Sequence, residues 1–133
     1  MVYFTDTSSG TLSTEELSRT TGASGFKSPV TTQHSLHLRV GEDATVMAVL
    51  YPVTTTQTTP TFTRLANGRA VKIESSYGTD YAFLGLAPFD FQQGDLWFRG
   101  QAGAVQVRPE GAHLSLSGKG QVRYKEQVLR TDQ

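Results

Sequence analysis

Short runs of alternating apolar and polar residues, separated by turn residues, restrict this chain to an all-β fold. His34, Leu36, Leu38 and Val40 fall on one face of an extended segment, and the residues between them fall on the other. Similar short runs follow, with Gly or Pro between nearly all of them. The sequence therefore predicts an antiparallel β-sandwich, with a jelly-roll-like arrangement or a closed barrel as alternatives.

The turn residues also indicate where the strands lie. Asn67-Gly68 predicts a hairpin because both residues tolerate positive φ, and residues 87–94 are expected to form a loop. Residues 44–51 are apolar on both faces apart from Thr45, which predicts a central strand covered on both sides. We expect strands at residues 33–40, 44–51, 61–65, 69–74, 81–86, 96–99, 104–108, 112–117, 121–124 and 127–129.

The first third of the chain is the least regular. Residues 6–10 and 20–29 have the Ser-, Thr- and Gly-rich composition of loops. Ser13 and Glu16 have the spacing of a capping box, which predicts one short helical turn that ends by Gly22. Because 133 residues suit one hydrophobic core, we predict a single domain over 1–133. Its parts are an irregular segment at 1–32 and a sandwich core at 33–130.

Composition excludes several classes of partner. Twelve basic and twelve acidic residues give a formal charge of zero, without the basic stripe that nucleic acid binding requires. The chain has no cysteine, so it forms neither a disulfide framework nor a thiolate zinc site. No run approaches the roughly 18 apolar residues that cross a bilayer, so no membrane span is expected.

The histidines do not form a predicted metal site. His34 and His37 are three residues apart on an expected strand and therefore point to opposite faces. His113 is isolated on the polar face of its own strand. A zinc site would need imidazoles that converge with a further ligand, so we expect no metal-binding histidine.

Nucleophilic and carboxylate catalysis also lack a motif. The chain has no G-x-S-x-G elbow, and its candidate acids, Glu74, Asp80, Asp90 and Asp95, lie at expected strand ends or turns. We therefore predict no catalytic residue and no cofactor. A structural calcium ion held by Asp90 or Asp95 with neighbouring carbonyls is the alternative.

One tryptophan offers a candidate binding surface. Alternation places Leu96 and Phe98 on one face of their strand and Trp97 beside Arg99 on the other. An indole can stack on the C–H groups of a sugar while a guanidinium pairs with a carboxylate or sulfate. Tyr77 is a candidate extension of this glycan-binding surface. The alternative is that Arg99 packs over Trp97 as a cation–π pair and nothing binds there.

Five segments resemble, in the same order, parts of a known sandwich domain. They are Val49-Leu50-Tyr51-Pro52 followed by a polar loop and Pro60, then Gly68-Arg69-Ala70-Val71-Lys72-Ile73, Asp80-Tyr81-Ala82-Phe83-Leu84-Gly85, Phe98-Arg99-Gly100-Gln101-Ala102-Gly103, and the tail at residues 114–124. Together they are similar to the C-terminal β-sandwich of heparinase II/III-like polysaccharide lyases. The resemblance covers about residues 33–130, and its motifs are strand and turn signals.

The resemblance implies an accessory module without a catalytic role. In that family an α/α toroid supplies most of the Tyr and His residues that abstract a proton beside a uronic-acid carboxylate for β-elimination. None of those residues can be matched in this chain, and the family's metal site lies outside the similar part. The implied partners are a catalytic domain or an anionic polysaccharide, in a secreted or periplasmic protein.

Two other functions stay open. A self-contained protein-interaction or assembly module, with no sugar ligand, would carry a large exposed apolar face. An independent small enzyme would need a cleft with converging ionisable groups; if the chain is part of an enzyme, the resemblance implies a polysaccharide lyase.

Overall fold

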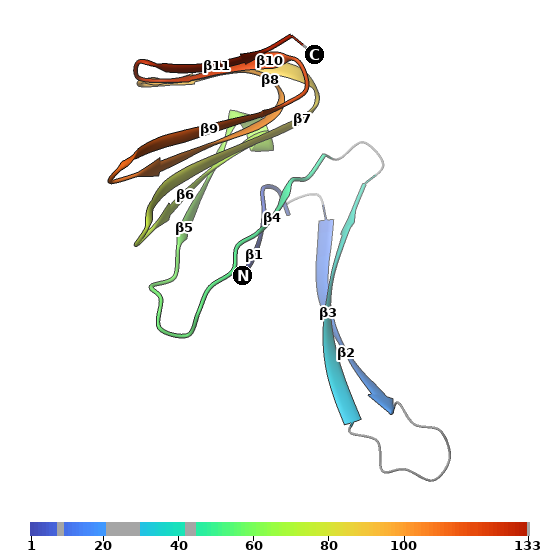
Figure 1. Ribbon diagram of the computed structural model, residues 1–133. Helices are drawn as coiled ribbons and strands as arrows, with labels where there is room; N and C mark the ends of the chain where they lie inside the picture. Colours follow the sequence, from blue (N-terminus) through green and yellow to red (C-terminus); the bar gives the residue numbers. More distant parts are fainter. Residues whose placement is uncertain (8–9, 21–29, 42–44, 133) are drawn as a thin grey trace. The chain divides into compact units, whose positions relative to one another are not determined.

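The computed structural model describes residues 1–7, 10–20, 30–41 and 45–132 of a chain built from antiparallel strands. A large antiparallel sheet and two small sheets give an all-β, sandwich-like fold, as predicted (Figure 1). The chain forms two compact units, and a single domain over 1–133 stays a prediction. The larger is Met1–Thr5 with Val46–Gln133, and the smaller is Asp6–Thr45.

The larger unit contains the seven-stranded sheet. Its strands are β5 (Thr61–Leu65), β6 (Ala70–Ser75), β7 (Gly78–Gln93), β8 (Leu96–Arg108), β9 (Gly111–Ser117), β10 (Gly120–Tyr124) and β11 (Gln127–Thr131). The order is β11-β10-β8-β7-β6-β5, and β9 pairs with β8 as well. A short 3-10 turn, η1 (Ala66–Gly68), joins β5 to β6 with Asn67 at φ 54° and Gly68 at φ 88°. The predicted hairpin is therefore confirmed.

The two longest strands fold this sheet into two layers. Residues 96–99 of β8 pair with β10, whereas residues 102–108 pair with β9. In β7 the register shifts between Leu84 and Phe89, so its two ends pair with different halves of β8. Figure 1 shows β10 and β11 lying over β9, β6 and β5. The bulge and the glycines near the bend of β8 let both strands turn without ending.

This bend overturns two expected boundaries. Residues 87–94, expected to form a loop, lie within or directly after β7. The strands expected at 96–99 and 104–108 are one strand, β8. The partner of β8 changes from β10 to β9 between Arg99 and Ala102, while β7 pairs with β8 on both sides of this point. The glycines at 100 and 103 look in the sequence like the turn residues that end a strand.

Aromatic rings fill the space between the two layers. Phe98 is fully buried and stacks on Phe83, with ring centroids 4.2 Å apart and an interplanar angle of 7°. A Cβ atom at Gly103 would lie 2.9 Å from Phe98 Cε2 and 2.7 Å from the Ser115 carbonyl oxygen. A glycine at this position therefore leaves the room that the Phe98 ring needs. The buried cluster consists of Ala70, Phe83, Phe89, Leu96, Phe98, Val105 and Val122.

A two-stranded ribbon forms a second core with β5 and β6. β1 (Val2–Phe4) pairs with β4 (Ala48–Leu50), and Tyr3 stacks on Phe62 of β5 at 4.7 Å. Val71 and Ile73 of β6 are buried in this cluster.

Residues 44–51 do not form the expected central strand. Within the described chain β4 spans three residues and pairs with β1 alone, and Leu50 is 76% exposed. Residue 44 lies outside the described residues. One face of this ribbon packs on the core and the other does not. Apolar residues on both faces therefore did not indicate a strand that is covered on both sides.

The smaller unit is a long hairpin of β2 (Gly10–Thr20) and β3 (Val30–Val40). The predicted helical turn is wrong, because Ser13 and Glu16 lie in β2 opposite His37 and His34. Eleven paired positions in a Ser- and Thr-rich strand outweigh one capping box. The expected irregular segment at 1–32 therefore contains β1 and β2, whereas Gly22 lies outside the described residues.

Candidate functional site

The outer face of β7, β8, β10 and β11 carries two rows of side chains that cross all four strands. The first row is Asp90, Arg99, Gln121 and Arg130, and the second is Gln92, Trp97, Arg123 and Val128. Directly opposed residues of antiparallel strands share a face with Cβ atoms about 5 Å apart. We call these eight residues the Trp97 face. Leu96 and Phe98 are buried on the other side of β8, as predicted.

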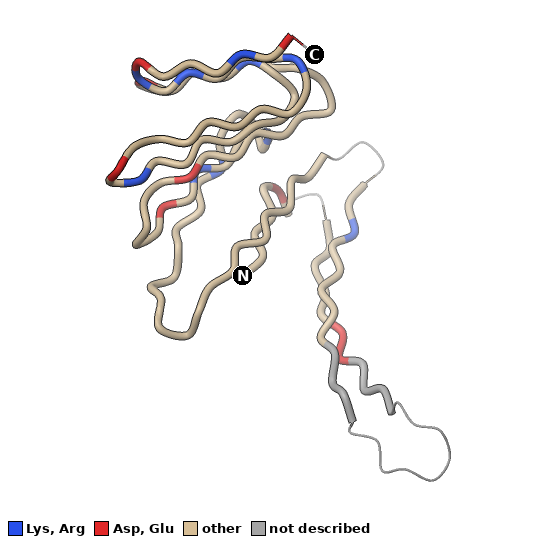
Figure 2. The backbone as a smooth tube through the Cα atoms, viewed as in Figure 1, with Lys and Arg blue, Asp and Glu red and all other residues tan. Residues whose placement is uncertain are grey.

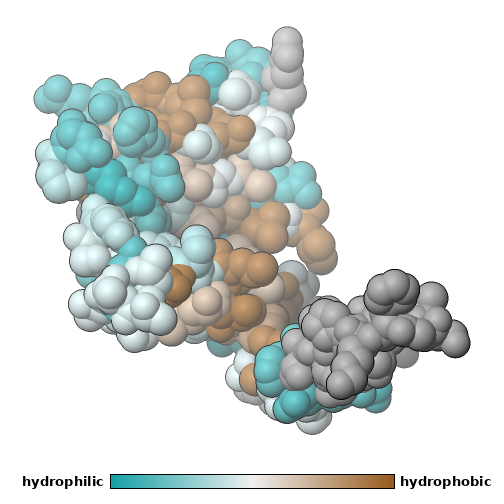
Figure 3. All heavy atoms as spheres, turned by 60° about the horizontal axis from the view of Figure 1, so that its bottom comes forward, coloured by the Kyte–Doolittle hydropathy of each residue, from teal (hydrophilic) through white to brown (hydrophobic). Residues whose placement is uncertain are grey.

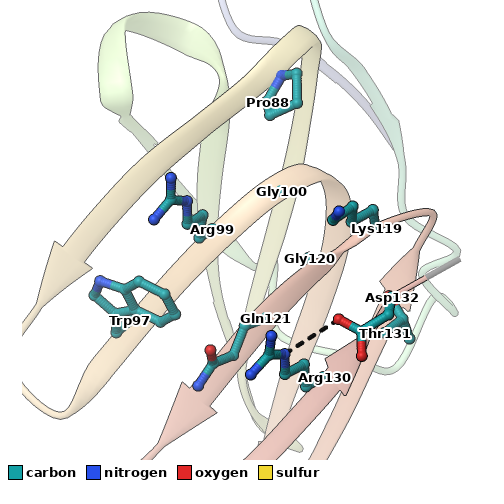
Figure 4. A pocket seen from close by; sticks show the side chains of 10 residues that line it. All are labelled: Pro88, Trp97, Arg99, Gly100, Lys119, Gly120, Gln121, Arg130, Thr131 and Asp132. Carbon is teal, nitrogen blue, oxygen red and sulfur yellow. Dashed lines mark hydrogen bonds and ion pairs between the residues drawn. The ribbon is translucent and has the colours of Figure 1, made fainter.

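Part of this face is hollowed. Trp97 and Arg99 line a concavity of about 450 Å³, within the range of about 300–1,000 Å³ that ligand sites occupy. Figure 4 shows side chains from β8, β10 and β11 converging around it. The lining residues are Pro88, Trp97, Arg99, Gly100, Lys119, Gly120, Gln121, Arg130, Thr131 and Asp132. The structure thus brings two of the three predicted binding residues together.

The concavity has a positive character. Arg99, Lys119 and Arg130 line it, against the single carboxylate of Asp132. Figure 2 shows basic residues distributed along the layer that contains β10 and β11. Lys119 forms no ion pair with a residue that the structure describes, so its charge is available to a ligand.

The two arginines of the concavity form only exposed ion pairs. Arg99 Nε lies 3.6 Å from Asp90 Oδ1, with the side chains 70% and 66% exposed. Arg130 Nε donates to Asp132 Oδ1 at 3.3 Å, again in water. Exposed pairs of this kind contribute about 0–1 kcal/mol. Either guanidinium can therefore exchange its carboxylate for an anion of a ligand at little cost.

Arg99 does not cover the indole ring. In the described part of the chain the cation–π contacts are Arg69 over Phe89 at 4.6 Å and Lys125 over Tyr124 at 5.7 Å. Figure 4 shows the Arg99 guanidinium pointing away from Trp97. The alternative, in which Arg99 packs over the Trp97 indole as a cation–π pair, is therefore not observed in the structure.

Tyr77 does not join the Trp97 face. It lies in the turn between β6 and β7 and lines a different concavity, together with Tyr51, Gln57 and Arg108. Its hydroxyl accepts a hydrogen bond from Gln57 Nε2. The expectation that Tyr77 extends the surface beside Trp97 and Arg99 is corrected, because the β6–β7 turn lies beside Val107, at the opposite end of β8 from Trp97.

The three histidines lie on two strands, β3 and β9. His34 and His37 lie at alternating positions of the regular strand β3, and His37 Nε2 lies 3.6 Å from Glu15 Oε2. His113 lies on β9 opposite Gln106. Among the residues that the structure describes, no group of three or more His, Asp or Glu side chains is arranged to hold a metal ion. The calcium alternative at Asp90 or Asp95 stays a prediction.

Sequence reasoning did not assign Lys119, Gln121, Arg123 or Arg130 to the site. Alternation along residues 120–124 and 127–131 indicates which side chains share a face. It does not indicate that this face adjoins Trp97, because that depends on the pairing of β10 with β8 and of β11 with β10.

Comparisons with known proteins do not identify the chain: no family model, curated protein or solved structure matches it. No helix in the described residues is long and apolar enough to span a membrane.

Proposed function

We propose that this chain is an accessory, non-catalytic β-sandwich module related to heparinase II/III-like polysaccharide lyases. It contacts an anionic glycan through the Trp97 face or supports a catalytic domain, in a secreted or periplasmic protein. The observation that carries the proposal is that Trp97 and Arg99 line one concavity with Lys119 and Arg130.

The chemistry of the concavity fits a charged sugar chain. An indole offers an apolar plane for the C–H groups of a pyranose ring, and it leaves the ring's hydroxyls in water. The guanidinium and ammonium groups that line the same concavity can pair with carboxylates or sulfates.

Calorimetric titration with heparin-derived and polygalacturonate-derived hexasaccharides tests the binding role. We expect weak, saturable binding that declines with added salt, because the contacts are exposed charges. Trp97→Ala and Arg99→Ala should each abolish it. Tyr77→Ala, an aromatic residue in the other concavity, should retain it. If the wild-type chain binds neither oligosaccharide, glycan binding is contradicted and only support of a catalytic domain remains as the proposed role.

A turnover assay tests the absence of catalysis. The full chain is incubated with the same polysaccharides, and the ultraviolet absorbance of unsaturated uronates is followed. We expect no product. Turnover by this chain alone would contradict the accessory assignment and would establish an independent enzyme.

A second function, an assembly module, is favoured by exposed apolar side chains at the β7 bulge. Leu84 is 50% exposed and Leu86 is 83% exposed. Figure 3 shows that apolar residues form several exposed areas on the face in view. Such patches commonly mark partner surfaces. Sedimentation at increasing concentration should then reveal self-association that Leu86→Ser removes. A chain that remains monomeric throughout argues against self-assembly.

A further inference from the structure

A second concavity, of about 460 Å³, lies on the larger unit and shares no residue with the one beside Trp97. It is formed by the loop that follows β4, the β6–β7 turn and the neighbouring strands β7 and β8. The lining residues are Tyr51, Pro52, Val53, Thr54, Gln57, Tyr77, Asp80, Gln106 and Arg108. We call it the Tyr77 groove.

The charges of the Tyr77 groove cancel. Arg108 Nη2 lies 2.7 Å from Asp80 Oδ1, and the two side chains are only 20% and 13% exposed. Arg108 Nη1 also donates to the Val107 carbonyl at 3.0 Å. An anionic ligand that took Arg108 from Asp80 would leave a largely buried carboxylate unpaired, which is costly. The groove therefore disfavours the ligands that suit the Trp97 face.

Its polar groups are held in place before any ligand arrives. Gln57 Oε1 accepts a hydrogen bond from the Thr54 N–H at 3.0 Å, and Gln57 Nε2 donates to the Tyr77 hydroxyl. The Gln57 N–H also bonds to the Thr54 carbonyl at 3.2 Å, which closes the loop. Gln57 thereby fixes Tyr77, whose hydroxyl retains its own proton to donate. Preorganised groups of this kind reduce the entropy lost on binding.

The remaining lining adds two kinds of contact. Tyr77 is 53% exposed and, with Tyr51 and Pro52, supplies apolar surface. Gln106 is exposed on β8 directly opposite Asp80 and offers an amide that both donates and accepts. Aromatic surface combined with donors and acceptors, and without net charge, is the complement of a ring that carries hydroxyl groups.

We propose that the Tyr77 groove is a binding site for a neutral saccharide unit, separate from the anionic contact at the Trp97 face. The Tyr77 ring would contact the sugar's C–H groups, while Gln106 and the Tyr77 hydroxyl bond to its hydroxyls. A proline-rich peptide is the competing ligand, because aromatic grooves also bind such segments. The ion pair and the amides that line this groove favour the saccharide.

Nuclear magnetic resonance of the isotope-labelled full chain tests this assignment. Cellohexaose, mannohexaose and xylohexaose are titrated in turn, and the side-chain amide signals of Gln57 and Gln106 are followed. We expect saturable shifts with at least one of the three. Tyr77→Ala should weaken that binding by at least about tenfold, the loss expected for one aromatic contact. Trp97→Ala should leave it unchanged.

A second variant, Tyr77→Phe, distinguishes loss of a binding contact from misfolding of the chain. Tyr77→Phe keeps the ring but removes the hydroxyl that Gln57 bonds to, and we expect an intermediate affinity with the signals of the sandwich core unmoved. The proposal is overturned if none of the three sugars shifts the two amides. It is also overturned if Trp97→Ala, and not Tyr77→Ala, removes binding, or if a proline-rich peptide binds and no sugar does. These outcomes do not depend on whether the Trp97 face binds an anionic glycan, because the two concavities share no residue.

Discussion

Arg123 of β10 lies directly opposite Trp97 of β8, which places an exposed guanidinium beside the only tryptophan of the chain. Arg123 does not line the concavity, so it extends the positive surface beyond the rim. Arg123→Ala should weaken binding of a heparin-derived hexasaccharide by about fivefold, or about 1 kcal/mol. Arg39→Ala, in the smaller unit, is the matched control and should bind normally. Equal affinity of the Arg123→Ala and wild-type chains would confine the site to the concavity.

Gly103 should resist substitution. Its added methyl would meet the Phe98 ring and the Ser115 carbonyl within 3 Å, so Gly103→Ala should lower the free energy of unfolding by about 1–3 kcal/mol. Gly41, where an added Cβ meets nothing within 4 Å, is the control, and Gly41→Ala should change stability by less than about 0.5 kcal/mol. Urea denaturation compares the two. A tolerated alanine at 103 would show that the layers can separate at no cost.

The Asp80–Arg108 pair should matter for stability as well as for the Tyr77 groove. Arg108→Met leaves the Asp80 carboxylate largely buried without its cation, and should cost about 1–3 kcal/mol of unfolding free energy. The double variant with Asp80→Leu should recover most of that loss, because an apolar pair replaces both charges. Thermal unfolding of both variants measures this. Additive losses in the double variant would contradict it.

Stability should fall at alkaline pH. Burial raises the pKa of Tyr81 above its ordinary value, and the hydrogen bond to Glu74 raises the pKa of Lys72. Above about pH 10, where these groups ionise in the unfolded chain, the folded chain holds more protons. The free energy of unfolding then decreases as the pH rises through the folded pKa values. In urea titrations at increasing pH, the free energy of unfolding of Tyr81→Phe should decrease less steeply with pH than that of the wild type. An identical dependence on pH would contradict a raised pKa of Tyr81.

Local patterns predicted most of the larger unit correctly. The Asn67-Gly68 turn forms, and Leu96 and Phe98 are buried on the face of β8 that Trp97 does not share. Each of these features depends only on alternation or turn chemistry. The β7 bulge was not predictable, since a bulge depends on the partner strand. Arg123 was missed for the same reason. The capping box at Ser13 failed because it competed with a whole strand pair.

The single tryptophan gives the most direct test of the Trp97 face. Its fluorescence reports on this site alone, so titration of the full chain with a heparin-derived hexasaccharide measures binding where we place it. We expect a saturable change in emission that diminishes with added salt and disappears in Arg99→Ala. An emission spectrum unchanged at saturating heparin hexasaccharide would contradict the proposed contact with an anionic glycan.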